Sequence, residues 1–169
     1  MADLHVNWDD YHSLIEDLGH RIQVSGWQFN QVVCIARGGL RVGDVLARIF
    51  DVPLAIMFTS SYREEGGRVQ NRLVISEHLT MATETLGDRV LLVDDLVDSG
   101  VTLRRVVEEL KQRYPQIQDI RTGVLWQKEC SVFVPDYTAR YLADNPWIHQ
   151  PMEKYDDMKP ADLARPVRL

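Results

Sequence analysis

Short apolar runs alternate with helical repeats along the chain. Continuous apolar runs at 32–36, 53–58, 90–93 and 120–126 are typical of strands buried on both faces of a sheet. Apolar residues also recur at three- and four-residue spacing after Asn7, after Gly39 and after Thr102, which predicts helices. The alternation predicts an α/β fold, a mostly parallel twisted sheet flanked by helices.

Less regular segments lie between and after these elements. Residues 60–72, SSYREEGGRVQNR, are polar and contain a glycine pair, which predicts a flexible loop. Residues 73–79 are expected to return from it as a short strand. Weaker apolar segments follow at 132–134 and 137–142, and the tail from Glu153 shows little periodicity.

Composition excludes several classes of protein. The 169 residues suit one domain, residues 1–169, and a net charge of −6 argues against a nucleic-acid partner. No apolar run approaches the roughly 20 residues of a membrane span. The polar start, MADLHVNWDD, is unlike a signal peptide. Two isolated cysteines, Cys34 and Cys130, indicate a reducing, cytoplasmic setting, and Cys34 is expected to be buried.

The most informative stretch is VLLVDDLVDSGVT, residues 90–102. Its second half lies between a predicted strand and a predicted helix, where free N–H groups and the helix dipole favour a phosphate. Gly100 permits close backbone approach, and the hydroxyls of Ser99 and Thr102 can donate hydrogen bonds. The alternative is an ordinary helix cap, for which the same residue types are common.

The acidic pair Asp94-Asp95 needs a separate explanation, because carboxylates repel a phosphate. Sugar hydroxyls donate hydrogen bonds to carboxylates, and Mg²⁺ takes oxygen ligands. A ribose 5-phosphate derivative with a metal ion satisfies both halves of the stretch. A structural pair, or one that holds Mg²⁺ alone, is the competing interpretation.

The same stretch resembles the phosphoribosyl pyrophosphate (PRPP) signature of the type I phosphoribosyltransferases. CIARGGL, residues 34–40, resembles their pyrophosphate loop, and SSY, residues 60–62, the start of their flexible loop. PWIHQP, residues 146–151, resembles the purine-binding segment of the bacterial xanthine-guanine enzymes. Lys128, 19 residues before Trp147, matches a lysine of that subfamily in spacing.

The resemblance implies roles for individual residues around PRPP. Asp98 would be the general base as well as part of the phosphate turn. Arg37 would bind pyrophosphate with the Gly38 and Gly39 backbone, and the Ala36–Arg37 peptide would be cis. The implied PRPP-binding residues are Arg37, Gly38, Gly39, Asp94, Asp95, Asp98, Ser99, Gly100, Val101 and Thr102. Mg²⁺ would be held by Asp94 and Asp95, with Glu153 or Asp156 as a second contact.

The resemblance also implies a base-binding hood, formed by the N-terminal segment and by residues of about 128–169. Trp147 would stack on the purine, the Ile148 backbone would meet its edge, and Lys128 would donate to O6. Ser61 and Tyr62 would close over the pyrophosphate. A core tryptophan and a solvated lysine are the alternatives for Trp147 and Lys128.

The implied activity is purine salvage, in which a 6-oxopurine and PRPP give a nucleoside 5′-monophosphate and pyrophosphate. His149 stands where the xanthine-guanine enzymes carry an acidic residue, which favours hypoxanthine and guanine over xanthine, and Met152 replaces an aromatic residue. The alternatives are a phosphoribosyltransferase for adenine or a pyrimidine, and a non-catalytic PRPP sensor. A homodimer or homotetramer is expected, with Trp27 and Phe29 as exposed aromatics compatible with an interface.

Overall fold

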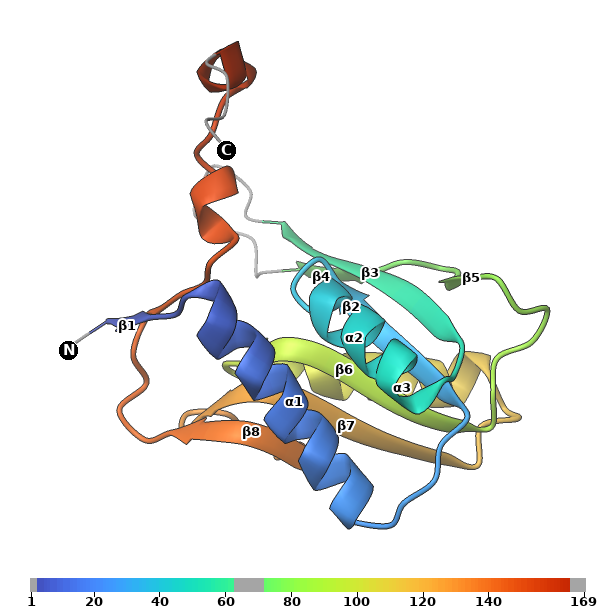
Figure 1. Cartoon of the computed structure of the whole chain (residues 1–169). Helices are drawn as coiled ribbons and strands as arrows, with labels where there is room; N and C mark the ends of the chain where they lie inside the picture. Colours follow the sequence, from blue (N-terminus) through green and yellow to red (C-terminus); the bar gives the residue numbers. More distant parts are fainter. Residues whose placement is uncertain (1–2, 63–71, 165–169) are drawn as a thin grey trace.

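The computed structural model of the chain describes residues 3–62 and 72–164. Three α-helices and two 3₁₀ helices lie among nine strands in the described ranges (Figure 1). The helices are α1 (Trp8–Val24), α2 (Leu40–Phe50), α3 (Val101–Arg113), η1 (Glu153–Tyr155) and η2 (Pro160–Ala164). The strands are β1 (Leu4–His5), β2 (Gln31–Ala36), β3 (Leu54–Tyr62), β4 (Arg72–Ile75), β5 (Thr80–Met81), β6 (Arg89–Val97), β7 (Asp119–Lys128), β8 (Tyr137–Leu142) and β9 (Ile148–His149).

The main sheet is mostly parallel, in the order β4-β3-β2-β6-β7-β8. The pairings of β2 with β3, β2 with β6, β6 with β7, and β7 with β8 are all parallel, whereas β4 and β5 each run antiparallel to β3. Helix α2 connects β2 to β3 and helix α3 connects β6 to β7, whereas residues 129–136 join β7 to β8 without a helix. The predicted fold class is confirmed.

Apolar helix faces cover the sheet on both sides. Tyr11, Leu18 and Leu46 of α1 and α2 pack into one core, and Leu103 and Val106 of α3 pack into the other. Figure 1 shows α1 and α2 on the near face of the sheet. Asn7 caps the first helix, because its Oδ1 accepts a hydrogen bond from the Asp10 N–H at 2.8 Å.

The connections from β2 and β6 run in opposite directions. The chain leaves β2 through α2 to reach β3, and leaves β6 through α3 to reach β7, while β2 and β6 are neighbours. The two turns that follow these strands therefore lie side by side at the carboxyl edge of the sheet. This reversal of strand order is where ligands bind in open α/β sheets.

Several predicted boundaries are wrong. β6 continues to Val97, beyond the predicted end at 93, because its ladder with β7 extends to the pair Val97–Gln127. The strand predicted at 73–79 ends at Ile75. Residues 60–62, predicted as part of a loop, extend β3 in an antiparallel pairing with β4; the glycine pair at 66 and 67 lies outside the described residues.

Two further expectations concern side-chain exposure. Trp27 is not exposed: only 7% of it is accessible, since it stacks on Phe29 and its indole N–H donates to Asp119 at 2.8 Å. Phe29 is itself partly buried against the core. Trp27 is therefore unavailable as an interface residue. Cys34 is buried as expected, and its burial raises the pKa of its thiol to about 12.

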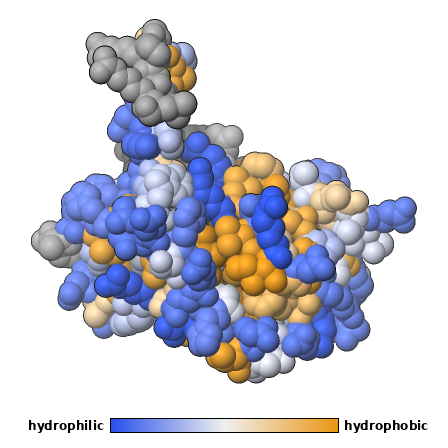
Figure 2. Space-filling model, viewed as in Figure 1, coloured by the Kyte–Doolittle hydropathy of each residue, from blue (hydrophilic) through white to orange (hydrophobic). Residues whose placement is uncertain are grey.

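The ends of the chain form a second, two-stranded sheet. β1 pairs in parallel with β9, with Leu4 opposite Ile148 and His5 opposite His149. The C-terminal turns η1 and η2 stand away from the main sheet (Figure 1). Figure 2 shows apolar side chains gathered over α2, where exposed Ile49 and partly buried Phe50 line a hollow of about 360 Å³ against α1. Within the described ranges, no helix has the length and apolar character to cross a membrane.

Candidate functional site

The turn after β2 is packed closely against β6. The peptide between Ala36 and Arg37 is cis, as expected. A Cβ added to Gly39 would lie 2.7 Å from the Val93 carbonyl oxygen and 2.8 Å from that of Ile35. A Cβ added to Gly38 would overlap the Asp95 carboxylate. The absence of side chains at Gly38 and Gly39 therefore lets the turn lie directly over the acidic pair.

Gly39→Ala should lower the free energy of unfolding by about 1–3 kcal/mol, since rigid backbone carbonyls block its Cβ. Urea unfolding monitored by circular dichroism would measure this. Gly123→Ala is the matched control: its Cβ would meet Leu18 at 3.6 Å, an ordinary contact, so its stability should change by less than about 0.5 kcal/mol. Equal effects from the two substitutions would contradict the close packing.

The acidic pair belongs to the carboxyl half of β6 and has specific hydrogen-bond partners. Asp94 Oδ1 accepts from the Asp95 N–H at 2.9 Å. Asp95 accepts from the Leu96 N–H at 2.8 Å and from the side-chain amide of Gln150 in a short hydrogen bond. These contacts orient both carboxylates at the mouth of the site and connect Asp95 to the segment after β9.

Burial raises the pKa of Asp94 well above its usual value, and the neighbouring charge of Asp95 raises it further. The ionised form of Asp94 is therefore unfavourable in the metal-free protein. A divalent cation beside the pair would offset both effects, because it supplies opposite charge and accepts carboxylate oxygens as ligands. The chemistry of this pair fits Mg²⁺.

Asp94→Asn should stabilise the metal-free protein at neutral pH. Because the folded-state pKa is raised, wild-type stability falls as pH rises from the unfolded value of about 3.9 through the folded value. The Asp94→Asn variant does not lose stability in this way, so it should melt at a higher temperature than wild type at neutral pH. The difference in melting temperature should shrink as pH falls toward 4. Thermal melts of both proteins in chelator across this range would measure the difference. A pH-independent difference would contradict the raised pKa.

The turn after β6 leads into a helix whose N-terminus is open. Gly100 has φ of 81°, a left-handed conformation that suits glycine, and α3 begins there without a side-chain cap. A Cβ at Gly100 would lie 2.6 Å from Ser131 Oγ and 2.7 Å from Phe133 Cβ, so residues 131–133 pack against the turn. Ser99 Oγ accepts a long hydrogen bond of 3.4 Å from the Val101 N–H, and the other N–H groups of the first turn can bind an anion.

Lys128 reaches this turn from the end of β7. Its side chain is buried, with only 8% of the residue accessible, and its Nζ lies 3.4 Å from Asp98 Oδ1. A solvated lysine, the alternative raised by the sequence, is excluded. Asp98 is itself largely exposed, with its carboxylate also 3.5 Å from the Cys130 thiol. The buried Lys128 ammonium thus contacts one oxygen of the Asp98 carboxylate, and the rest of that carboxylate is accessible.

Two adjoining cavities meet at Arg37, Gly38 and Asp95. One, of about 400 Å³, is lined by most of the predicted PRPP-binding residues: Arg37, Gly38, Asp94, Asp95, Asp98, Ser99, Gly100 and Thr102. The other, of about 430 Å³, is lined by Arg37, Gly38, Arg41, Asp95, Gln150, Met152, Glu153, Tyr155 and Asp156. Glu153 and Asp156 therefore face the second cavity, and Asp156 lies 3.8 Å from the Arg37 guanidinium.

Other predicted residues lie outside these cavities. Gly39 and Val101 line neither one, and Gly39 lies behind the first turn. Trp147 is 64% accessible, which excludes the core alternative, while Ile148 is buried in the small sheet. Ser61 and Tyr62 end β3, and their side chains are outside the described residues.

Three residues near the site were not identified from the sequence. Gln150 lies within the quoted PWIHQP segment, but its contact with Asp95 is visible only in the fold. Arg41, in the first turn of α2, lines the second cavity, and its guanidinium lies over the Trp8 ring at 5.1 Å. Tyr11 is fully buried, and its hydroxyl finds no partner among the described residues. Burial raises the pKa of the Tyr11 hydroxyl, and the negative charge of Asp95 raises it further.

A parallel sheet with an open helix N-terminus and an acidic pair at its switch point is typical of α/β proteins that bind phosphorylated ligands. The chain belongs to the phosphoribosyl transferase domain family, whose model matches residues 7–157. The xanthine-guanine phosphoribosyltransferase of Ruegeria sp. (strain TM1040) is 30% identical over 156 residues, covering 82% of this chain and 88% of that protein. The enzyme of the same name from Idiomarina loihiensis is 28% identical, covering 89% and 86%.

Solved structures agree with this assignment. A purine phosphoribosyltransferase from Pyrococcus horikoshii Ot3 superposes with a TM-score of 0.73 at 28% identity, covering 89% of this chain and 93% of that one. The Helicobacter pylori xanthine-guanine-hypoxanthine phosphoribosyltransferase has a TM-score of 0.74 at 22% identity, covering 92% and 96%, and is similar in fold. The resemblance to type I phosphoribosyltransferases is confirmed.

Proposed function

We propose that this protein is a purine salvage phosphoribosyltransferase that converts a 6-oxopurine, with hypoxanthine and guanine favoured over xanthine, and PRPP to the nucleoside 5′-monophosphate and pyrophosphate. The observation that carries the proposal is the buried Lys128 beside Asp98, at the edge of a cavity lined by the PRPP signature. The names of the xanthine-guanine relatives support a purine as the base.

The turn after β6 and the turn after β2 bind opposite ends of PRPP. The N–H groups at the start of α3 and the Ser99 and Thr102 hydroxyls bind the 5′-phosphate. Arg37 and the Gly38 backbone bind pyrophosphate, where a guanidinium forks onto phosphate oxygens. Asp94 and Asp95 bind the ribose hydroxyls between these ends. Their negative charge also stabilises the cationic sugar that develops as pyrophosphate leaves.

Mg²⁺ is the cofactor that this arrangement implies. Asp94 and Asp95 would hold it, with Glu153 or Asp156 across the second cavity, and it would neutralise charge on the leaving pyrophosphate. Gln150, which donates to Asp95, keeps that carboxylate oriented. Arg37 and Arg41 add positive charge on the same side of the cavity.

The base lies beside Asp98 and Lys128. The Asp98 carboxylate takes the proton that the purine loses as its nitrogen attacks the anomeric carbon. Lys128 donates to the carbonyl at purine O6 and would face a second donor if adenine bound, which disfavours adenine. The position of Lys128 Nζ, 3.4 Å from Oδ1 of the proposed general base Asp98, supports this role.

The small β1–β9 sheet forms the hood over the purine, with residues of about 128–169. β1 bonds to the carbonyls on either side of Ile148, at Trp147 and His149. In a parallel ladder this leaves the Ile148 main chain facing the opposite edge of β9, free to meet the base. Trp147, exposed next to it, supplies a face for stacking when the hood closes.

The proposal includes a loop that closes over the site, a homo-oligomer and a cytoplasmic location. Ser61 and Tyr62 cover the pyrophosphate, which excludes water from the cationic intermediate state.

The protein is a homodimer or homotetramer, measurable by light scattering after gel filtration. It acts in the cytoplasm, where the salvage substrates and the reduced cysteines both fit.

The test is direct. The protein is mixed with PRPP and Mg²⁺, and guanine, hypoxanthine, xanthine or adenine is added to separate reactions, with the nucleotide measured by chromatography. Product from guanine or hypoxanthine, and little from adenine, is expected. Product from adenine alone would overturn the choice of base. PRPP binding without product from any base would instead indicate a PRPP sensor.

A further inference from the structure

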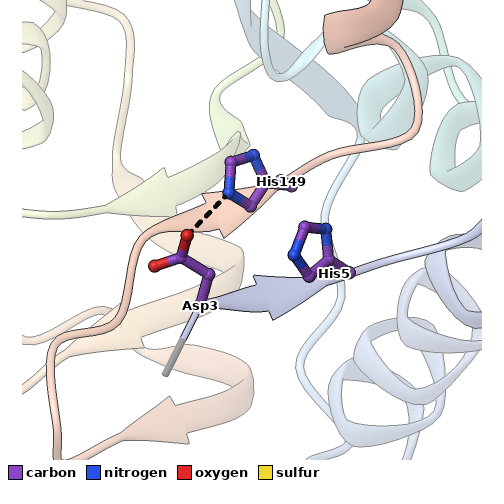
Figure 3. Close-up of side chains that lie close together, drawn as sticks. All are labelled: Asp3, His5 and His149. Carbon is purple, nitrogen blue, oxygen red and sulfur yellow. Dashed lines mark hydrogen bonds and ion pairs between the residues drawn. The ribbon is translucent and has the colours of Figure 1, made fainter. Parts of the chain in front are cut away.

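A second cluster of polar side chains lies in the small sheet, apart from the acidic pair. Asp3, His5 and His149 place one ligand atom each within 4.8 Å of one another. Figure 3 shows the Asp3 carboxylate joined to the His149 ring, with the His5 ring beside them on the neighbouring strand. None of the three lines either cavity of the candidate site.

The register of β1 and β9 brings the two imidazoles together. His5 is directly opposite His149, and side chains at paired positions of a parallel ladder project to the same side. The rings lie 4.4 Å apart between centroids and 9° from parallel. Main-chain hydrogen bonds from Leu4 to Trp147 (2.8 Å) and from Val6 to His149 (3.0 Å) hold the strands in this register.

The His149 ring is placed between two carboxylates. Its Nε2 lies 3.1 Å from Asp3 Oδ2, and its Nδ1 lies 3.6 Å from Glu153 Oε2. A metal-bound histidine typically donates its second ring nitrogen to a carboxylate, which fixes the tautomer and directs the other nitrogen to the metal. Glu153 is in the position of that outer carboxylate, and Nε2 then points toward Asp3.

We propose that Asp3, His5 and His149 bind a divalent transition-metal ion such as Zn²⁺, with Glu153 as the outer partner of His149, which leaves Asp156 as the carboxylate across the second cavity for Mg²⁺. Two imidazole nitrogens and one carboxylate oxygen are ligands that zinc accepts at about 2.0–2.2 Å. The two imidazole planes are nearly parallel without the ion, so the exposed His5 ring must turn to direct a nitrogen at it, and the ligand atoms must close by about 1 Å. Water completes the coordination, as in other three-residue zinc sites.

This site differs in chemistry from the one proposed for Mg²⁺. Magnesium prefers oxygen ligands and dehydrates reluctantly, so it competes poorly for two imidazoles. A zinc ion bound here would link β1 to β9 through His5 and His149, next to Ile148 and the exposed Trp147. The bound ion therefore stabilises the small sheet, whether or not the proposed base specificity is correct.

The test is zinc titration by calorimetry of the full chain without an affinity tag, in excess Mg²⁺. Wild type is expected to bind one equivalent, with two imidazole nitrogens seen by X-ray absorption, and to melt at higher temperature with zinc. His5→Gln and His149→Gln should lose at least about tenfold in affinity, and Glu153→Gln about 10- to 100-fold. His5 is exposed, so its substitution should leave the fold intact.

Two matched controls separate this site from adventitious binding. His20→Gln removes an exposed histidine of α1 far from the cluster in sequence, and Cys130→Ser removes the exposed thiol. Both variants should bind zinc as wild type does. If His5→Gln binds zinc as tightly as wild type, or if Cys130→Ser abolishes binding, the proposal is overturned and Asp3 and His149 form only a hydrogen-bonded pair.

Discussion

Asp98→Asn is expected to lower kcat by about 10²- to 10⁴-fold, the range for loss of a positioned general base. Asparagine has nearly the same shape but cannot take the proton from the purine. The backbone of the phosphate turn is unchanged, so the KM for PRPP should stay within a few-fold of wild type. Single-turnover measurement of nucleotide formation would separate the chemical step from product release.

Asp144→Asn is the matched control for Asp98→Asn. Asp144 is exposed in a turn that lines neither site cavity, so the same chemical change there should leave kcat unaltered. A kcat for Asp98→Asn that is close to wild type would show that water or another group accepts the proton. The Cys130 thiol, 3.5 Å from this carboxylate, would then need to be tested next.

Lys128→Met is expected to reduce kcat/KM for guanine by about 10- to 100-fold, the worth of a hydrogen bond from a charged donor. Methionine retains most of the buried aliphatic stem, so packing at the end of β7 should be preserved. Adenine turnover should be unchanged or higher, because the donor that opposes its amino group is gone. The ratio of the two kcat/KM values is the measurement.

Lys111→Met is the control for Lys128→Met. Lys111 is exposed on α3 and is far from the base in this arrangement, so the ratio should not change. If guanine and adenine lose equally in Lys128→Met, the lysine acts through Asp98 and does not contact O6. The ion pair at 3.4 Å would then be its whole function.

The strands that form the sheet were largely predictable because a strand buried on both faces must be apolar throughout. The runs at 32–36 and 90–93 lie within β2 and β6. The extension of β6 to Val97 was not predictable, because polar residues there continue the ladder only through pairing with β7. The predicted loop was too long for the same reason, since residues 60–62 pair with β4.

In the candidate site, too, some contacts could be predicted from the sequence and others could not. Most residues of the two turns come together because they follow neighbouring parallel strands, which a local motif is enough to indicate. The contact between Gln150 and Asp95 joins residues 55 positions apart, and the contact between Arg37 and Asp156 joins residues still farther apart. No local pattern marks either pair, because each depends on where the C-terminal segment returns.

The sequence by itself determined the α/β class, the family and the turn that we propose binds phosphate, because hydrophobic periodicity and a contiguous motif are local properties. The tertiary structure decided that Lys128 is buried against Asp98, that Trp27 belongs to the core, and that His5 faces His149. These outcomes depend on strand register and on the packing of distant segments. Neither is encoded in the spacing of residues along a single stretch of chain.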